Sequence, residues 1–128
     1  MQERYLFKAK RTDNGKWIQG YLYGIWERRY ILWGMTNDIP NMVEVDPSTI
    51  CQCTELKDKN GKLIWENDIV NCLSEECCGY IGWNESEVGF YFNVLLEDGG
   101  FEEEHIYDYQ DWIEVIGNII DNPELLEV

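Results

Sequence analysis

The chain has 128 residues, the size of one ordinary domain, and its hydrophobic content of 45% is enough to build one core. Its formal net charge of −15, from 25 acidic and 10 basic residues, disfavours a protein whose overall surface binds nucleic acid. No apolar run approaches the roughly 18 residues of a membrane-spanning helix, and Met1–Tyr5 lacks the apolar stretch of a secretion signal. We therefore expect a soluble, intracellular protein.

The charges are unevenly distributed along the chain. Residues 1–33 contain seven basic and three acidic residues, a net charge of +4, and residues 34–62 contain three basic and five acidic residues, a net charge of −2. Residues 63–128 contain 17 acidic residues and no Lys or Arg, a net charge of −17. Such a concentration of carboxylates repels phosphate backbones and attracts basic partners.

The first predicted elements are two strands joined by a tight turn. Tyr5–Lys10 alternates apolar and charged residues, and Trp17–Tyr23 does so less cleanly. Asn14-Gly15 lies between them, and Asn-Gly is the preferred pair of a type I′ turn because both central residues need positive φ. The sequence therefore predicts an N-terminal β-hairpin.

Short strands are also predicted in the middle of the chain, where β-branched and aromatic residues recur between turn-forming ones. These strands are expected at Glu27–Trp33, Met42–Val45 and Thr49–Thr54. Asn37–Asn41 is predicted to be an irregular connection between two of them, and Asp46-Pro47 is predicted to end the strand that precedes it.

The stretch Thr54–Val70 has a charged, turn-forming centre between two apolar flanks. Asn60-Gly61 is a second Asn-Gly turn, followed by apolar strands at Leu63–Trp65 and Asp68–Leu73. We expect positive φ at Gly61, and hydrogen bonds from nearby backbone N–H groups to the carboxylates of Asp58 and Asp68. The stretch is therefore predicted to be a corner of the fold. The side chains expected to pack inward there are Leu56, Ile64, Ile69 and Val70.

The last part of the chain continues in the same way. Further strands are expected at Gly79–Trp83, Val88–Leu96 and Trp112–Gly117. Asn122–Leu126 fits a short helical turn, because Asn can cap a helix and Pro suits its first position. Short strands separated by Gly-containing turns are typical of small barrels and sandwiches. The predicted fold class is therefore mainly β, a small β-barrel or meander with little helix.

Three stretches of the sequence are distinctive in combination. The run Gln52–Lys62 ends in Leu-Lys-Asp-Lys-Asn-Gly-Lys and is followed by Glu-Asn-Asp-Ile-Val at residues 66–70. Asn14–Leu22 and the ending Val115–Leu126 complete the set. Together they resemble the YopX family, small proteins encoded by bacteriophages and prophages, and the resemblance covers nearly the whole chain.

The resemblance implies a mainly β protein whose later part looks like an SH3-type barrel, and it brings no known reaction. We accordingly expect an N-terminal β-hairpin subdomain at residues 1–50 and a C-terminal SH3-like β-barrel subdomain at residues 51–128. A phage-encoded protein of this kind is expected in the cytoplasm of the bacterial host. The residues interpreted as a signature of the fold are Leu56, Asp58, Gly61, Asp68, Ile69 and Pro123.

Two positions depart from the family pattern, which has Gly where this chain has Glu55 and Asn67. If those glycines provide positive φ, Asn tolerates the conformation at modest cost, whereas Glu is less well suited to it. The local turn geometry is therefore expected to depart from the family pattern most at Glu55.

The cysteines do not have the spacing of a zinc site, because a zinc ribbon uses two Cys-x-x-Cys pairs. A disulfide is disfavoured in a reducing cytosol. The glycine pairs of the chain are followed by strands, not by a helix that could bind phosphate. We therefore expect reduced thiols, no metal and no cofactor. The cysteines concerned are Cys51, Cys53, Cys72, Cys77 and Cys78.

His105 is the single histidine, and beside Glu104 it could act as a general base. No motif of a nucleophilic enzyme accompanies it, so a surface histidine is the simpler interpretation and no residue is assigned to catalysis.

An acidic cluster surrounds His105. It lacks the alternating ligands and the glycine of a calcium-binding loop. A solvated face is its simplest interpretation, and a docking surface for a basic protein is the functional one. The candidate partner-binding residues are Glu102, Glu103, Glu104, Asp108 and Asp111.

We therefore expect a non-enzymatic accessory protein that binds a basic protein through its acidic later half. The alternative is a nucleic-acid-binding protein that uses the basic N-terminal hairpin, where aromatic rings stack on bases and cations hold phosphates. The basic hairpin could also meet the acidic half, either within the same molecule or in a neighbouring copy, and the second case would form a homo-oligomer. The hairpin residues concerned are Lys8, Lys10, Arg11, Lys16, Arg28 and Arg29, with Trp17, Tyr21 and Tyr23.

Overall fold

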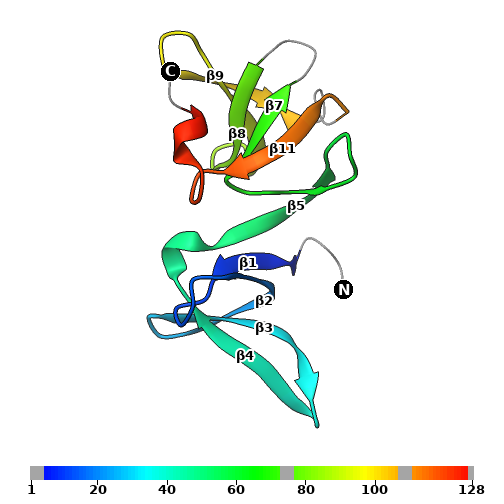
Figure 1. The fold of residues 1–128 in the computed structure, drawn as a ribbon, viewed down its shortest axis with the longest axis vertical. Helices are drawn as coiled ribbons and strands as arrows, with labels where there is room; N and C mark the ends of the chain where they lie inside the picture. Colours follow the sequence, from blue (N-terminus) through cyan, green and yellow to red (C-terminus); the bar gives the residue numbers. More distant parts are fainter. Residues whose placement is uncertain (1–4, 73–76, 107–110, 127–128) are drawn as a thin grey trace. The chain divides into compact units, whose positions relative to one another are not determined.

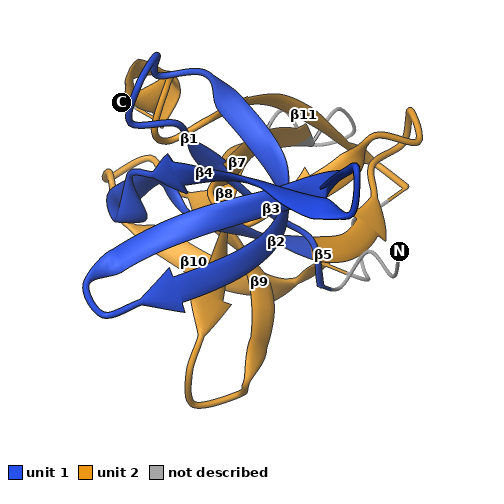
Figure 2. Cartoon of the chain, turned by 90° about the horizontal axis from the view of Figure 1, so that it is seen from below, with its two compact units in different colours: residues 1–53 blue, residues 54–128 orange. Residues whose placement is uncertain are grey.

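The computed structural model describes residues 5–72, 77–106 and 111–126 of the chain. Most of these residues lie in antiparallel β-strands, and the helices among them are two short 3-10 helices, so the predicted mainly β class is confirmed. The chain divides into two compact units, unit 1 at residues 1–53 and unit 2 at residues 54–128 (Figure 2). No helix in the described part of the chain is long and apolar enough to cross a membrane.

Unit 1 is an antiparallel sheet with the strand order β4-β3-β2-β1-β5. Its elements, drawn in Figure 1, are β1 (Phe7–Lys10), β2 (Trp17–Ile25), β3 (Arg28–Thr36), β4 (Ile39–Val45), the 3-10 helix η2 (Pro47–Thr49) and the first half of β5 (Cys51–Lys57). One face of the sheet is apolar, and its side chains form the core of this unit. The core consists of Ala9, Ile31 and Val45, with Phe7, Ile18, Leu22, Val43 and Ile50 packed against them.

The hairpin of β1 and β2 is confirmed, but its turn is not the predicted type I′ turn. Only Gly15 has positive φ there, and the loop is closed by a bond from Arg11 N to Lys16 O of 2.9 Å. Positive φ at two consecutive residues occurs instead at Asn37 and Asp38, between β3 and β4. The predicted irregular connection is therefore wrong: a tight turn leads directly into β4.

Unit 2 has the antiparallel strand order β10-β9-β8-β7-β11, and the second half of β5 lies beside β6. Figure 1 shows β7, β8 and β11 side by side. One strand was not predicted, because the glutamates of β10 favour other conformations and only its pairing with β9 makes the segment extended. The elements are β6 (Leu63–Trp65), β7 (Asp68–Cys72), β8 (Cys77–Asn84), β9 (Gly89–Leu95), β10 (Phe101–His105), β11 (Ile113–Asn118) and the 3-10 helix η4 (Pro123–Leu126).

The predicted barrel is not closed. In the described residues the strands form two open antiparallel sheets, although a single bridge joins Arg11 to Val45 at the ends of β1 and β4. The short helical turn predicted near the C-terminus is confirmed as η4. The core of unit 2 consists of Ile64, Val70, Ile81, Phe92, Ile106 and Ile113, with Leu56, Phe90, Val94 and Val115 packed against them.

Candidate functional site

The corner between β5 and β6 is held by the carboxylate of Asp58. Its Oδ1 accepts hydrogen bonds from the backbone N–H groups of Asn60 and Lys62, both at 2.9 Å, and its Oδ2 accepts one from Val115 N at 3.0 Å. Burial alone would raise the pKa of Asp58, but the three backbone donors and the Lys62 ammonium outweigh it, so the pKa lies below its usual value. Asp58 therefore joins the corner to β11.

The other residues of the predicted fold signature are also placed in structural roles. Gly61 has a φ of +79°, as predicted, and closes the turn with a bond from its N–H to Asp58 O of 3.0 Å. Asp68 is buried, and its Oδ2 accepts a hydrogen bond from Trp65 N at 2.8 Å. Ile69 is fully buried, and Pro123 begins η4. The conspicuous residues of Thr54–Val70 therefore have structural roles in unit 2.

The three consecutive glutamates of β10 do not form one surface. Successive residues of a strand point to opposite faces of the sheet. Glu104 pairs with Phe92 of the core, so Glu102 and Glu104 project from the core side. Glu103 pairs with Asn93 and projects from the other side. The acidic cluster is thus divided between two faces.

The two aspartates of the cluster do not lie in β10. Asp108 falls outside the described residues, and Asp111 is an exposed residue shortly before β11. Since β10 and β11 are the two edge strands in the order of this sheet, Asp111 and Glu103 come from opposite edges.

The face on which Glu103 lies, called here the outer face of unit 2, is rich in aromatic and polar side chains. The strand registers place its residues opposite one another: Tyr80 pairs with Asn93, and Tyr91 pairs with both Gly82 and His105. Because cross-strand neighbours share a face, these side chains form one surface. The outer face consists of Tyr80, Gly82, Asn84, Tyr91, Asn93, Phe101, Glu103 and His105.

A pocket of about 300 Å³ lies on this outer face. It is lined by residues of β8, β9 and β10, and by Glu66 and Asn67 of the turn between β6 and β7. Gly82 is closely covered by the Asn93 side chain, because a Cβ atom there would be only 2.8 Å from Asn93 Nδ2. We call this the acidic aromatic pocket. Sequence reasoning found one of its carboxylates, Glu103, but not the pocket, which depends on strand register.

The aromatic rings of the pocket are held by neighbours from β10. The Tyr80 ring meets the Phe101 ring edge to face, with centroids 5.1 Å apart, and the Tyr91 ring lies 5.0 Å from that of His105. Between those two β10 positions, Glu103 Oε2 accepts a hydrogen bond from Asn84 Nδ2 at 2.6 Å. The walls and one carboxylate are therefore fixed before any ligand binds.

The pocket has a negative electrostatic environment. Burial, and then the carboxylates of Glu87 and Glu103, raise the pKa of Tyr91 above its usual value, because each of these effects disfavours the phenolate. The same carboxylates favour a cation in the pocket.

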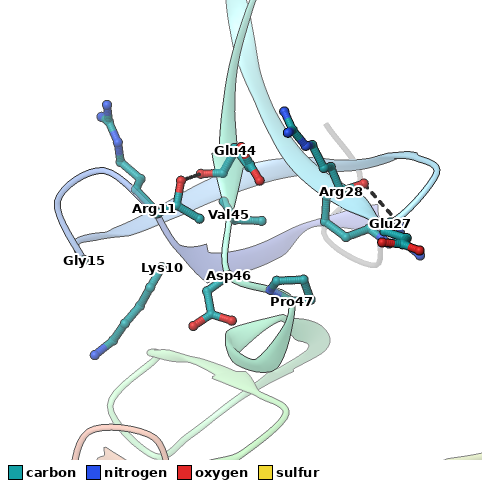
Figure 3. A pocket seen from close by; sticks show the side chains of 11 residues that line it. Lys10, Arg11, Gly15, Glu27, Arg28, Glu44, Val45, Asp46 and Pro47 are labelled. Carbon is teal, nitrogen blue, oxygen red and sulfur yellow. Dashed lines mark hydrogen bonds between the residues drawn. The ribbon is translucent and has the colours of Figure 1, made fainter.

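Unit 1 contains a second pocket, of about 380 Å³, shown in Figure 3. Lys10 and Arg11, which are neighbours on the chain, point in opposite directions there, and the carboxylates of Glu27, Glu44 and Asp46 lie among the basic side chains. The pocket therefore does not concentrate charge of one sign, and it offers no clear preference for an anion or a cation.

Some of the basic hairpin residues share one face of unit 1. Lys8 and Lys10 lie on β1 with their Nζ atoms 4.9 and 5.6 Å from the centroid of the Trp17 ring. Tyr21 and Tyr23 follow Trp17 at even spacing along β2, so they project from the same face, and both are exposed.

Two of the arginines have structural partners. Arg11 forms an ion pair with Asp13, with a distance of 2.7 Å from its Nη2 to Oδ2. Arg29 donates through Nη1 to the carbonyl oxygens of Trp26 and Arg28, at 2.8 and 3.0 Å. The ion pair of Arg11 offsets one charge of the basic hairpin, and the bonds of Arg29 fix its side chain at the turn between β2 and β3.

Three of the five cysteines, Cys51, Cys53 and Cys78, have described side chains, whereas those of Cys72 and Cys77 lie outside the described part. Cys51 and Cys53 are buried in unit 1, and burial raises the pKa of the Cys78 thiol in unit 2. In the part of the chain that the structure describes, no group of three or more His, Cys, Asp or Glu side chains is placed to hold a metal ion. His105 is exposed, with its ring against Tyr91.

Comparison with known proteins identifies the family. The family model described as YopX protein matches residues 6–127, which is nearly the whole chain. No curated protein matches the sequence. The chain belongs to the YopX family.

Proposed function

We propose that this member of the YopX family is a phage accessory protein without catalytic activity, which binds a basic protein through the outer face of unit 2. The observation that carries the proposal is the acidic aromatic pocket, a recess with fixed aromatic walls and carboxylates. It lies in the unit that holds 19 acidic and three basic residues, a net charge of −16.

The charge of unit 2 supports a basic partner on physical grounds. A field of one sign accelerates the encounter with an oppositely charged protein and disfavours acidic competitors. This long-range attraction is screened beyond about 8 Å at physiological salt, so binding should weaken as salt is added. Aromatic side chains at the centre of such a surface supply the short-range contacts that charge alone does not.

Affinity capture from a bacterial extract tests the proposal. The full chain should retain a basic protein at about 0.05 M salt and release most of it at about 0.5 M. The variant Glu66→Gln/Glu103→Gln should retain less of it. The control variant Asp111→Asn/Glu124→Gln, which removes the same charge from unit 2 at positions that do not line the acidic aromatic pocket, should retain it. Capture of acidic proteins only, or capture insensitive to both salt and the first variant, would contradict the proposal.

A second function is favoured by one observation: Lys8, Lys10, Trp17, Tyr21 and Tyr23 share a face of unit 1. Cations beside exposed rings suit single-stranded nucleic acid. Unit 1 as a whole has seven basic and six acidic residues, a net charge of only +1, which makes this function the weaker one.

A gel shift with single-stranded oligonucleotides separates the two functions. Binding at low salt that is lost in Lys8→Glu/Lys10→Glu, and unchanged in Glu66→Gln/Glu103→Gln, would favour the nucleic-acid function. Arg11 is left unchanged in the Lys8→Glu/Lys10→Glu variant, because its ion pair with Asp13 is part of the hairpin turn. The absence of a shift at low salt would leave the basic-protein function in place.

A further inference from the structure

We propose that the acidic aromatic pocket receives the guanidinium group of an arginine side chain from the basic partner. The inference rests on the proposed function and specifies which chemical group the outer face recognises. It follows from the combination of ring faces, carboxylates and free volume in a single recess.

The rings of Tyr80 and Tyr91 provide the walls. A cation within about 6 Å of an aromatic centroid is attracted by the negative face of the ring. Phe101 and His105 hold the two tyrosine rings from the β10 side, so the partner need not order them on binding. Less conformational entropy is then lost, which favours affinity.

The carboxylates of Glu103 and Glu66 provide the hydrogen-bond acceptors. Glu103 accepts one bond from Asn84, and an ionised carboxylate has about four acceptor positions in all, so it can accept further N–H groups. Glu66 lies on the turn between β6 and β7 and lines the same pocket. Two carboxylates from separate elements therefore line the recess that the guanidinium group would enter.

The aromatic and acidic lining of the pocket favours arginine over lysine. The guanidinium group is planar, stacks on aromatic faces and carries five N–H donors in a fixed arrangement, whereas the ammonium group of lysine is compact and more strongly hydrated. Gly82 contributes no side chain to the pocket, and the Asn93 side chain covers it, because a Cβ atom there would be only 2.8 Å from Asn93 Nδ2. A planar cation uses the rings and the carboxylates at the same time.

The segment that builds most of the pocket cannot supply the cation itself. Residues 63–128 contain no Lys or Arg. Within unit 2 the basic residues are Lys57, Lys59 and Lys62, and Lys59 pairs with Glu114 at 3.6 Å. Burial, and then Glu87 and Glu103, raise the pKa of Tyr91, so this environment suits a cation that the segment itself does not contain.

The test uses three short basic peptides that differ only in the central residue, which is arginine, lysine or the neutral isostere citrulline. Titration of the full chain should show the arginine peptide binding about tenfold more tightly than the citrulline peptide, and more tightly than the lysine peptide. Tyr91→Leu and Glu103→Gln should each weaken arginine binding several-fold. Tyr91→Phe, which keeps the ring, should retain it, and Asp111→Asn/Glu124→Gln should leave it unchanged.

Thermal unfolding of each variant identifies those that are folded. If Tyr91→Leu does not fold, the test of the pocket uses Glu103→Gln on its rim instead. Equal affinity for the arginine and citrulline peptides, or normal binding by folded pocket variants, would overturn the arginine pocket. If all the basic peptides then still bound in a salt-dependent manner, the proposed function would survive that result. If no basic peptide bound even at low salt, both proposals would fail.

Discussion

Glu55 shows how a single residue can carry backbone strain in an otherwise regular strand. It lies within β5 with a φ of +71°, in the left-handed region. This conformation is unfavourable for residues with a Cβ atom, although Asn and Asp tolerate it better than the others. Asn67, with a φ of +72°, has the same conformation but a side chain that tolerates it. The sequence identified both positions through the family glycines they replace, and the structure confirms positive φ at both.

Replacing Glu55 with Gly should stabilise the protein. The left-handed conformation costs about 1–2 kcal/mol for a residue with a Cβ atom, and Gly avoids this cost. The greater freedom of Gly in the unfolded chain destabilises the folded state by about 0.5–1 kcal/mol and so offsets part of the gain. We expect a net increase of roughly 0.5–1 kcal/mol in the free energy of unfolding, measured by urea denaturation. The matched control is Lys57→Gly in the same strand, which should destabilise. A loss of stability in Glu55→Gly would show that the strain is absent.

Gly61 provides the converse test. Its φ is +79°, and an added Cβ atom would meet nothing within 4 Å, so the cost of a side chain there is conformational and not steric. Gly61→Val should lower the free energy of unfolding by roughly 1–3 kcal/mol. Gly61→Asn should cost less, because Asn visits the left-handed region more readily. Equal melting temperatures for the wild type and Gly61→Val would refute the assignment.

At the scale of elements, the carboxylate of Asp58 connects the corner between β5 and β6 to β11. Asp58→Asn removes the charge that strengthens three backbone hydrogen bonds. Since hydrogen bonds to charged groups contribute about 1.5–3 kcal/mol each but are not additive, we expect a loss of roughly 2–3 kcal/mol near neutral pH.

The loss should depend on pH in a defined direction. The pKa of Asp58 is depressed in the folded protein, so its contribution is complete above the unfolded pKa of about 3.9 and disappears as the pH falls through the folded pKa. The difference in unfolding free energy between the wild type and Asp58→Asn should therefore narrow as the pH is lowered below about 4. If the difference in unfolding free energy stayed constant over this range, the Asp58 side chain would not be forming these hydrogen bonds as an ionised carboxylate.

The elements also show what sequence can and cannot predict. The strands of unit 1 except the start of β4, the corner at Asp58 and the helical turn at Pro123 were predicted, because they follow from local alternation, turn residues and caps. The strand Phe101–His105 was missed, because its extended form depends on pairing with β9 and not on its own glutamates. The turn at Asn14-Gly15 was placed correctly but with the wrong conformation, since loop closure by Arg11 and Lys16 decides it.

The acidic aromatic pocket could not be predicted from local sequence patterns. Glu103 was predicted as part of an acidic run, but only the alternation of β10 separates it from Glu102 and Glu104. Its neighbours Tyr80 and Tyr91 come from two other strands, and their registers with β10 decide that they meet. Sequence alone therefore indicated that the proposed binding surface is negatively charged, but not where on unit 2 it lies.

For the whole molecule, the essential feature is the unequal division of charge between two units, with a net charge of −16 in unit 2 and +1 in unit 1. We propose that recognition takes place on unit 2, where the charge accompanies the acidic aromatic pocket. NMR mapping on the ¹⁵N-labelled full chain with the arginine peptide tests this assignment most directly. We predict that the largest amide shifts fall in residues 78–84, 89–95 and 101–105 and diminish as salt is added. Shifts concentrated in residues 8–30, or spread evenly over the acidic surface of unit 2, would contradict it.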